Sequence, residues 1–201
     1  MLVGPRSARD RLWRVAAAQR GYFTAAQALD AGYSYQAQRF HTQRGNWIRI
    51  DRGIYRFREF LELGSDDTDS LVRWSLWSKG RAVVSHLTAL AVHDLGVANP
   101  EAAVHLTVPQ GFRQVDPAVI MHRAVLDEDD IVQRDGFKVT SPLRAIAESA
   151  AISADQDVID SAVSDLLERG EATRRQLLHA AERLGPQASL GVERALAEDP
   201  S

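Results

Sequence analysis

The first 45 residues carry apolar side chains at helical spacing, divided by short polar or glycine-containing stretches. Leu12, Val15 and Ala16 share one side of a first helix. Thr24 and Ser34 each stand directly before another helical segment, where their hydroxyl groups are favourable N-caps. The pattern therefore predicts three helices, over about 7–20, 25–31 and 35–44.

The stretch GNWIRIDRGIYRF (45–57) has β-branched and aromatic residues on both sides of Asp51-Arg52-Gly53. This predicts a β-hairpin with its turn at those three residues. Neighbouring strand residues point to opposite faces, and the pattern leaves open which of them face the core. Three helices followed by a basic hairpin is the order of a winged helix-turn-helix.

The rest of the chain predicts a mixed domain. Residues 59–70 read as a linker, and a helix follows. A short strand or turn precedes a helix capped by Ser85, and strand patterns occupy 102–109, 117–126 and 136–142. From about residue 142 the pattern is helical. The predicted fold class is α+β: an N-terminal winged helix-turn-helix over 1–58 and a mixed α/β domain over 59–201 that ends in helices.

Composition excludes several classes of function. The 201 residues include no cysteine, which excludes disulfides, thiolate metal sites and cysteine nucleophiles. The sequence has no apolar run long enough for a signal peptide or a membrane span, so we expect a cytoplasmic protein.

The charge is divided unevenly along the chain. Residues 1–58 hold 11 arginines and three acids, a net charge of +8, whereas the remainder holds 13 Lys+Arg against 24 Asp+Glu, a net charge of −11. Codon bias towards arginine explains neither the shortage of acids nor its restriction to the first segment. The asymmetry favours a nucleic-acid-binding segment joined to an acidic domain.

The third predicted helix has the residue types of a recognition helix. At 100° per residue, Ala37, Phe40, His41 and Arg44 are expected on the core side. The opposite side carries side chains that read base edges or bind phosphates, and the helix has no acid. We expect this side to face the major groove of DNA with Tyr35, Gln36, Arg39, Thr42 and Gln43. Arg49, Arg52 and Arg56 of the hairpin are expected to contact phosphates. About five phosphate contacts predict a log–log salt slope of roughly −4 to −5 per protomer.

Evidence for an enzyme is weak. His86, His93, His105 and His122 lie on predicted neighbouring elements and form a conceivable metal site, but histidines packed in a core are commoner than ligands. The acidic run at 127–130 suits a solvated loop or helix start better than a nuclease centre. Nuclease, triad and phosphate-loop motifs are absent from the sequence. We therefore expect no catalytic site, no metal and no cofactor.

Four motifs resemble one protein family. They are RIDRGIYRF, AVVSHLTALAVHDLG, VHLTVP and DGFKVTSPLRAIAE, and with the three-helix start they make residues 8–150 similar to AbiEi-type antitoxins. The resemblance implies a winged helix that binds inverted repeats upstream of its own operon and represses it. It also implies an antitoxin domain over 59–201 that counters a nucleotidyltransferase-like toxin.

The resemblance leaves other points open. Binding to inverted repeats implies a dimer or cooperative assembly on double-stranded operator DNA, and contact with the toxin can be direct or indirect. The apolar positions of 155–196 suit a domain core or a surface for a partner. Two alternatives are a metal-dependent nuclease and a toxin-sequestering module without specific DNA binding.

Overall fold

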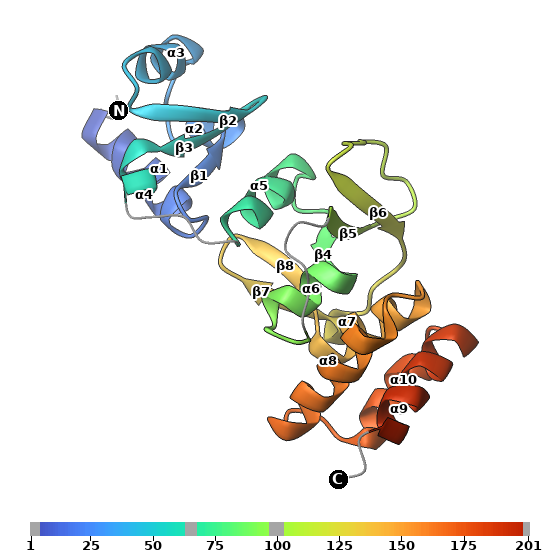
Figure 1. The fold of residues 1–201 in the computed structure, drawn as a ribbon. Coiled ribbons are helices and arrows are strands. Elements are labelled where there is room, and N and C mark those ends of the chain that lie inside the picture. Colours follow the sequence, from blue (N-terminus) through green and yellow to red (C-terminus); the bar gives the residue numbers. More distant parts are fainter. Residues whose placement is uncertain (1–4, 63–67, 97–102, 199–201) are drawn as a thin grey trace. The chain divides into compact units, whose positions relative to one another are not determined.

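The computed structural model describes residues 5–62, 68–96 and 103–198, which form a mixed α+β fold with two compact units. The first unit comprises residues 1–80 and 134–137. Its elements, in chain order, are α1 (Pro5–Ala17), β1 (Tyr22–Thr24), α2 (Ala25–Asp30), α3 (Tyr35–Gln43), β2 (Trp47–Asp51), β3 (Ile54–Phe57), α4 (Arg58–Glu62) and α5 (Asp69–Trp77) (Figure 1). The three helices and the hairpin follow in the predicted order.

The core of the first unit is aromatic. Phe23, Trp47 and Phe57 are buried, and the Phe23 ring lies 4.8 Å from each of the other two rings. Phe23 belongs to β1, a strand that the sequence pattern did not predict. This strand pairs antiparallel with β3, so the sheet order is β1-β3-β2. The expected linker begins instead as α4, whose Phe60 packs on Trp13 at 5.0 Å, while residues 63–67 lie outside the described part.

A buried ion pair attaches α5 to this sheet. The Arg56 guanidinium on β3 donates a hydrogen bond of 2.6 Å to Asp69 at the start of α5, and the two residues are 3% and 6% exposed. Arg20 makes a second, longer ion pair of 3.4 Å with Asp69. Because α5 packs on β1 and β3, the compact unit extends to Gly80 instead of ending at the expected boundary, residue 58.

The second unit comprises residues 81–133 and 138–201 and contains a sheet in the order β6-β5-β4-β8-β7. Its first half contains β4 (Val83–Val84), α6 (His86–Val92), β5 (Val104–Val108), β6 (Val119–Arg123) and the 3-10 turn η1 (Glu128–Asp130). The second half contains β7 (Ile131–Arg134), β8 (Phe137–Thr140), α7 (Pro142–Ala151), α8 (Gln156–Glu168), α9 (Arg174–Glu182) and α10 (Pro186–Glu198). β5 runs parallel to β6 and antiparallel to β4.

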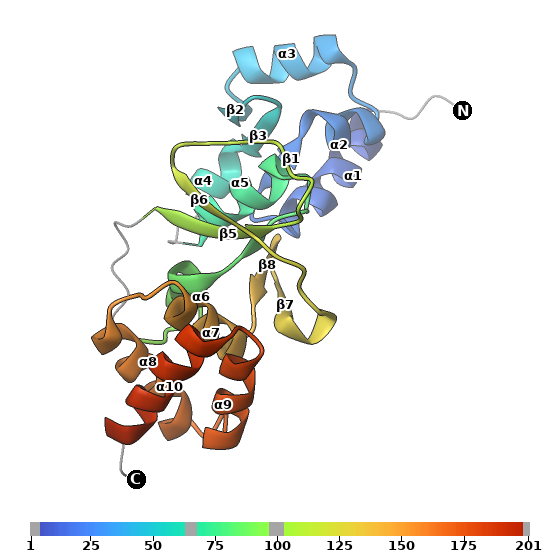
Figure 2. The ribbon, with the colours of Figure 1, turned by 90° about the vertical axis from the view of Figure 1, so that its right-hand side faces the viewer.

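Helices α7–α10 pack together at one side of this sheet, with α7 in contact with the other three (Figures 1 and 2).

A network of charged side chains in the second unit corrects our expectation for the acidic run at 127–130. Asp130 is 4% exposed and accepts hydrogen bonds from Arg144 at 3.1 Å and Arg183 at 3.0 Å, while Asp127 also pairs with Arg183. Two of the four acids therefore stabilise the fold. Among the described residues, none of the helices has the length and apolar character needed to cross a membrane.

The buried pair gives a stability prediction. Arg56→Ala leaves the Asp69 carboxylate buried without its closest partner, so we expect the free energy of unfolding to fall by about 3–5 kcal/mol. Urea denaturation of the full chain measures this change. Arg52→Ala, an exposed arginine of the same hairpin, is the matched control and is expected to change stability by about 0.5 kcal/mol or less. Equal losses in the two variants would contradict the assignment.

Candidate nucleic-acid interface

Polar contacts, not an apolar face, hold α3 in place. Ser34 caps the helix, as predicted, by accepting a hydrogen bond from the backbone N–H of Ala37 at 3.1 Å. Gln38 is the buried residue of the helix, and its side-chain amide donates to the carbonyl oxygen of Ala25 at 3.2 Å. Since Ala25 begins α2, this contact fixes the two helices to each other.

Aromatic stacking joins α3 to the hairpin. The His41 ring lies 4.9 Å from the Trp47 ring in a stacked arrangement, and Tyr33 meets Trp47 edge-on at 4.9 Å. Burial lowers the pKa of His41 below its usual value, which favours the neutral ring in this stack. Thr42 is half-buried, and its hydroxyl donates to the carbonyl oxygen of Gln38 at 2.9 Å. These contacts place α3 beside β2, as both ribbon views show (Figures 1 and 2).

The outer face of α3 is larger than the sequence predicted. Its exposed residues are Tyr35, Gln36, Arg39, Phe40, Gln43 and Arg44. Phe40 and Arg44 were expected on the core side, but Phe40 is 52% exposed and the Arg44 guanidinium lies over its ring at 5.4 Å. The prediction was wrong because it assumed an apolar inner face, whereas the inward side chain is Gln38. Among the described residues, Arg39 has no ion-pair or hydrogen-bond partner for its guanidinium.

The hairpin ends in a turn whose conformation is locally determined. Gly53 has φ +73°, a left-handed value that favours glycine, and the strands shift register between Arg49 and Asp51. The Asp51 carboxylate accepts a hydrogen bond from the backbone N–H of Arg52 at 2.6 Å and pairs with Arg73 at 2.8 Å. These two contacts, the backbone hydrogen bond foremost, lower the pKa of Asp51 and so favour its charged form, and the ion pair with Arg73 compensates that charge.

The three hairpin arginines have different environments. Arg49 and Arg52 are exposed, and no carboxylate in the described part of the chain pairs with either guanidinium. Arg56, which we expected to contact phosphates, is instead buried against Asp69, with its guanidinium 4.7 Å from the centre of the Tyr22 ring. It cannot reach a ligand at the surface. The sequence offered no signal for this, since the partner Asp69 lies 13 residues away on another element.

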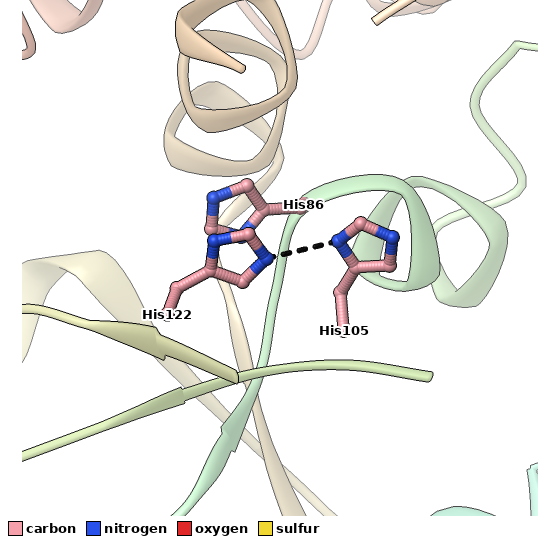
Figure 3. A group of neighbouring side chains, drawn as sticks. All are labelled: His86, His105 and His122. Atoms are coloured by element: carbon pink, nitrogen blue, oxygen red, sulfur yellow. Dashed lines mark hydrogen bonds between the residues drawn. The ribbon is translucent and has the colours of Figure 1, made fainter. Parts of the chain in front are cut away.

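The second unit brings together three of the four histidines noted in the sequence. His86, His105 and His122 are neighbours (Figure 3). His93 is not one of this group, and its Nε2 makes a hydrogen bond of 2.8 Å with the carbonyl oxygen of Thr140. Burial is the main cause that lowers the pKa of His86 to about 2 and that of His122 to about 4, and it also lowers the pKa of His105.

Comparison with known proteins gives a family match for one segment and a fold likeness for the whole chain. Residues 10–58 match the family described as "Transcriptional regulator, AbiEi antitoxin". The match is limited to this segment and supports a toxin–antitoxin regulator. No curated protein matches the chain. The whole chain aligns with 86% of the crystal structure of the RV2827C protein from Mycobacterium tuberculosis, with 14% identity and a TM-score of 0.54, a likeness that shows the fold alone.

Proposed function

We propose that this protein is an antitoxin that binds operator DNA through a winged helix-turn-helix at 1–58 and represses its own operon. Residues 59–201, of which 81–133 and 138–201 form the second unit, then act as the antitoxin domain against a nucleotidyltransferase-like toxin, in the cytoplasm. The observation that carries the proposal is the outer face of α3, which presents glutamine and arginine side chains and no acid. The family match covers this same helix.

In the proposed complex α3 is the recognition helix. Gln36, Arg39 and Gln43 are exposed, and their side chains have the donor and acceptor geometry that reads adenine and guanine edges in the major groove. Tyr35, at the first turn of the helix, is 72% exposed and supplies a hydroxyl for a phosphate or base edge. Thr42 is a weaker candidate because its hydroxyl already donates within the helix. Arg44, next to Phe40, joins the set on the evidence of its exposure.

The hairpin is the proposed wing, and Arg49 and Arg52 are its phosphate contacts. Both lie near a turn whose only carboxylate is bound to Arg73, so no free acid next to them repels the DNA backbone. Phosphate contacts add affinity that does not depend on sequence, whereas base contacts add specificity. The two elements therefore have separable roles.

The charge of the second unit supports a separate role for it. It holds 10 Lys+Arg against 18 Asp+Glu, so phosphate repels it, and an acidic surface accelerates association with a basic protein. Operators with inverted repeats imply two copies of the chain per site, as a dimer or a cooperative assembly.

The recognition role is tested by binding to the DNA upstream of the chain's own gene. Arg39→Ala should weaken specific binding by about 1–3 kcal/mol and relax the base preference at one position, because a base contact is lost. Arg52→Ala should weaken binding to operator and unrelated DNA equally. Fluorescence anisotropy with both DNAs at fixed salt measures the two effects. Arg194→Ala, an exposed arginine of α10, is the control and should bind as the wild type does. Unchanged specific binding in Arg39→Ala would exclude α3 as the reader.

The salt dependence counts the phosphate contacts. With Arg56 buried, four exposed arginines remain on α3 and the hairpin, so the log–log slope should be about −3 to −4 per protomer, shallower than the −4 to −5 expected from the sequence. Affinity measured across a series of salt concentrations gives the slope. Arg49→Ala and Arg52→Ala should each reduce its magnitude by about 1. A slope unaffected by both variants would rule out the hairpin as a phosphate contact.

The two roles should also separate in cells. When the chain is co-expressed with the product of the neighbouring gene from an independent promoter, Arg39→Ala should still restore growth, because toxin neutralisation resides in the other unit. The same variant should fail to repress a reporter under the native promoter. Loss of both phenotypes in a variant that remains folded would show that the two roles share one surface.

A further inference from the structure

Three elements of the second unit bring their histidines to one place. His86 is the first residue of α6 and is separated from β4 by Ser85 alone, while His105 lies on β5 and His122 on β6 (Figure 3). β5 and β6 run parallel, with Thr107 opposite His122, so the two strand histidines are offset by two residues and lie on the same face of the sheet. The cluster therefore depends on the sheet order, not on a local sequence motif.

The ring nitrogens of the three histidines converge. His105 Nδ1 and His122 Nε2 are 3.0 Å apart, and the His86 ring stacks on the His122 ring with 3.5 Å between centroids. One nitrogen from each ring lies within 4.8 Å of one nitrogen from each of the others. Around a tetrahedral ion bound at 2.0–2.1 Å, nitrogen ligands lie about 3.3 Å apart. To bind one ion together, the three rings must rotate from this arrangement, above all the His86 ring that stacks on His122.

The surroundings hold the cluster in position. The backbone N–H of His105 donates to Thr88 Oγ1 at 2.9 Å, and His86 Nδ1 lies 2.9 Å from Ser85 Oγ. His86 has φ +53°, an unusual conformation for a residue other than glycine, and this conformation directs its ring towards the strands. Its position is thus held by the fold at some conformational cost.

A carboxylate lies next to the cluster. Glu148 Oε2 on α7 is 3.8 Å from His86 Nδ1, and the Glu148 carboxylate also accepts the His86 backbone N–H at 3.4 Å. A carboxylate beside a ligating histidine orients the ring and supplies negative charge to a bound cation. Arg144 opposes this by pairing with Glu148 Oε1 at 2.9 Å, but Arg144 is itself paired with Asp130. With Arg183, which pairs with Asp130 and Asp127, the network holds three acids against two cations.

We propose that His86, His105 and His122 form a binding site for a divalent transition-metal ion of the Zn²⁺ type. Imidazole nitrogen suits Zn²⁺, Cu²⁺, Ni²⁺ and Co²⁺, whereas Mg²⁺ and Ca²⁺ prefer oxygen. Three protein ligands leave one position of a tetrahedral ion for water or another ligand. The ion joins β5, β6 and the start of α6, so the site goes beyond the proposed regulatory function and does not depend on it.

The test uses the full chain without an affinity tag, treated with a chelator, dialysed and titrated with Co²⁺. We expect one ion per chain with the visible absorption bands of tetrahedral Co²⁺, and displacement of that ion by Zn²⁺. His122→Gln and His105→Gln should each lower the Co²⁺ affinity at least about tenfold. Loss of a group that only orients a ligand already costs about 10–100-fold, and loss of the ligand itself should cost no less. His122 is the less buried of the two and is the variant better able to fold.

Two histidines serve as matched controls. His179→Gln alters an exposed histidine on α9, and His93→Gln alters the histidine that bonds Thr140, so both variants should bind Co²⁺ as the wild type does. X-ray absorption of the Zn²⁺-loaded wild type tests the site without any variant and should show three imidazole ligands. The proposal is overturned by the absence of stoichiometric binding, by full affinity in a folded His122→Gln protein, or by a zinc environment with fewer than three imidazoles.

Discussion

The buried ion pair between Arg56 and Asp69 determines how the first unit presents its charge. It attaches α5 to the three-stranded sheet and removes one arginine of the hairpin from the surface. The same carboxylate also takes up Arg20, so one acid from outside the first 58 residues neutralises part of their basic excess. Counted over the compact unit, 14 Lys+Arg stand against 9 Asp+Glu, a net charge of +5 instead of +8. The basic character survives, but it is concentrated on fewer exposed side chains than a count along the sequence suggests.

Local signals in the sequence predicted the local structure well. Thr24 and Ser34 cap their helices as expected, because their hydroxyl groups accept hydrogen bonds from backbone N–H groups of the first turn. The expected cap Ser85 makes no side-chain hydrogen bond to its helix, and its hydroxyl lies 2.9 Å from His86 Nδ1 instead. The hairpin at 47–57 is equally local, since its turn contains the glycine that its backbone requires. By contrast, β1 is only three residues long and depends on pairing with β3, about 30 residues later. No short window of sequence contains that information.

The candidate sites show the same division between local and distant causes. Exposure of Gln36, Arg39 and Gln43 follows from helical geometry and was predictable, whereas Phe40 was misplaced because α3 turns a glutamine inwards. In the second unit, the sequence grouped four histidines but gave no reason to separate His93 from the others. The sequence placed Asp130 in a solvated acidic run. In the structure it pairs with Arg144 on α7 and Arg183 at the end of α9. Burial of polar groups is a tertiary property, and these were the residues for which sequence reasoning failed.

The way α3 is held explains why its outer face can be so polar. A helix that depends on an apolar stripe for docking must keep about 100° or more of its surface hydrophobic. Here the hydrogen bond from Gln38 to Ala25 and the stacking of His41 on Trp47 dock the helix instead. These contacts use only a narrow strip of the helix surface. Five of the nine helix residues and the C-cap are then not needed for packing, which leaves room for Tyr35, Gln36, Arg39, Phe40, Gln43 and Arg44 at the surface. Such a helix can change its outer residues without loss of the contacts that position it.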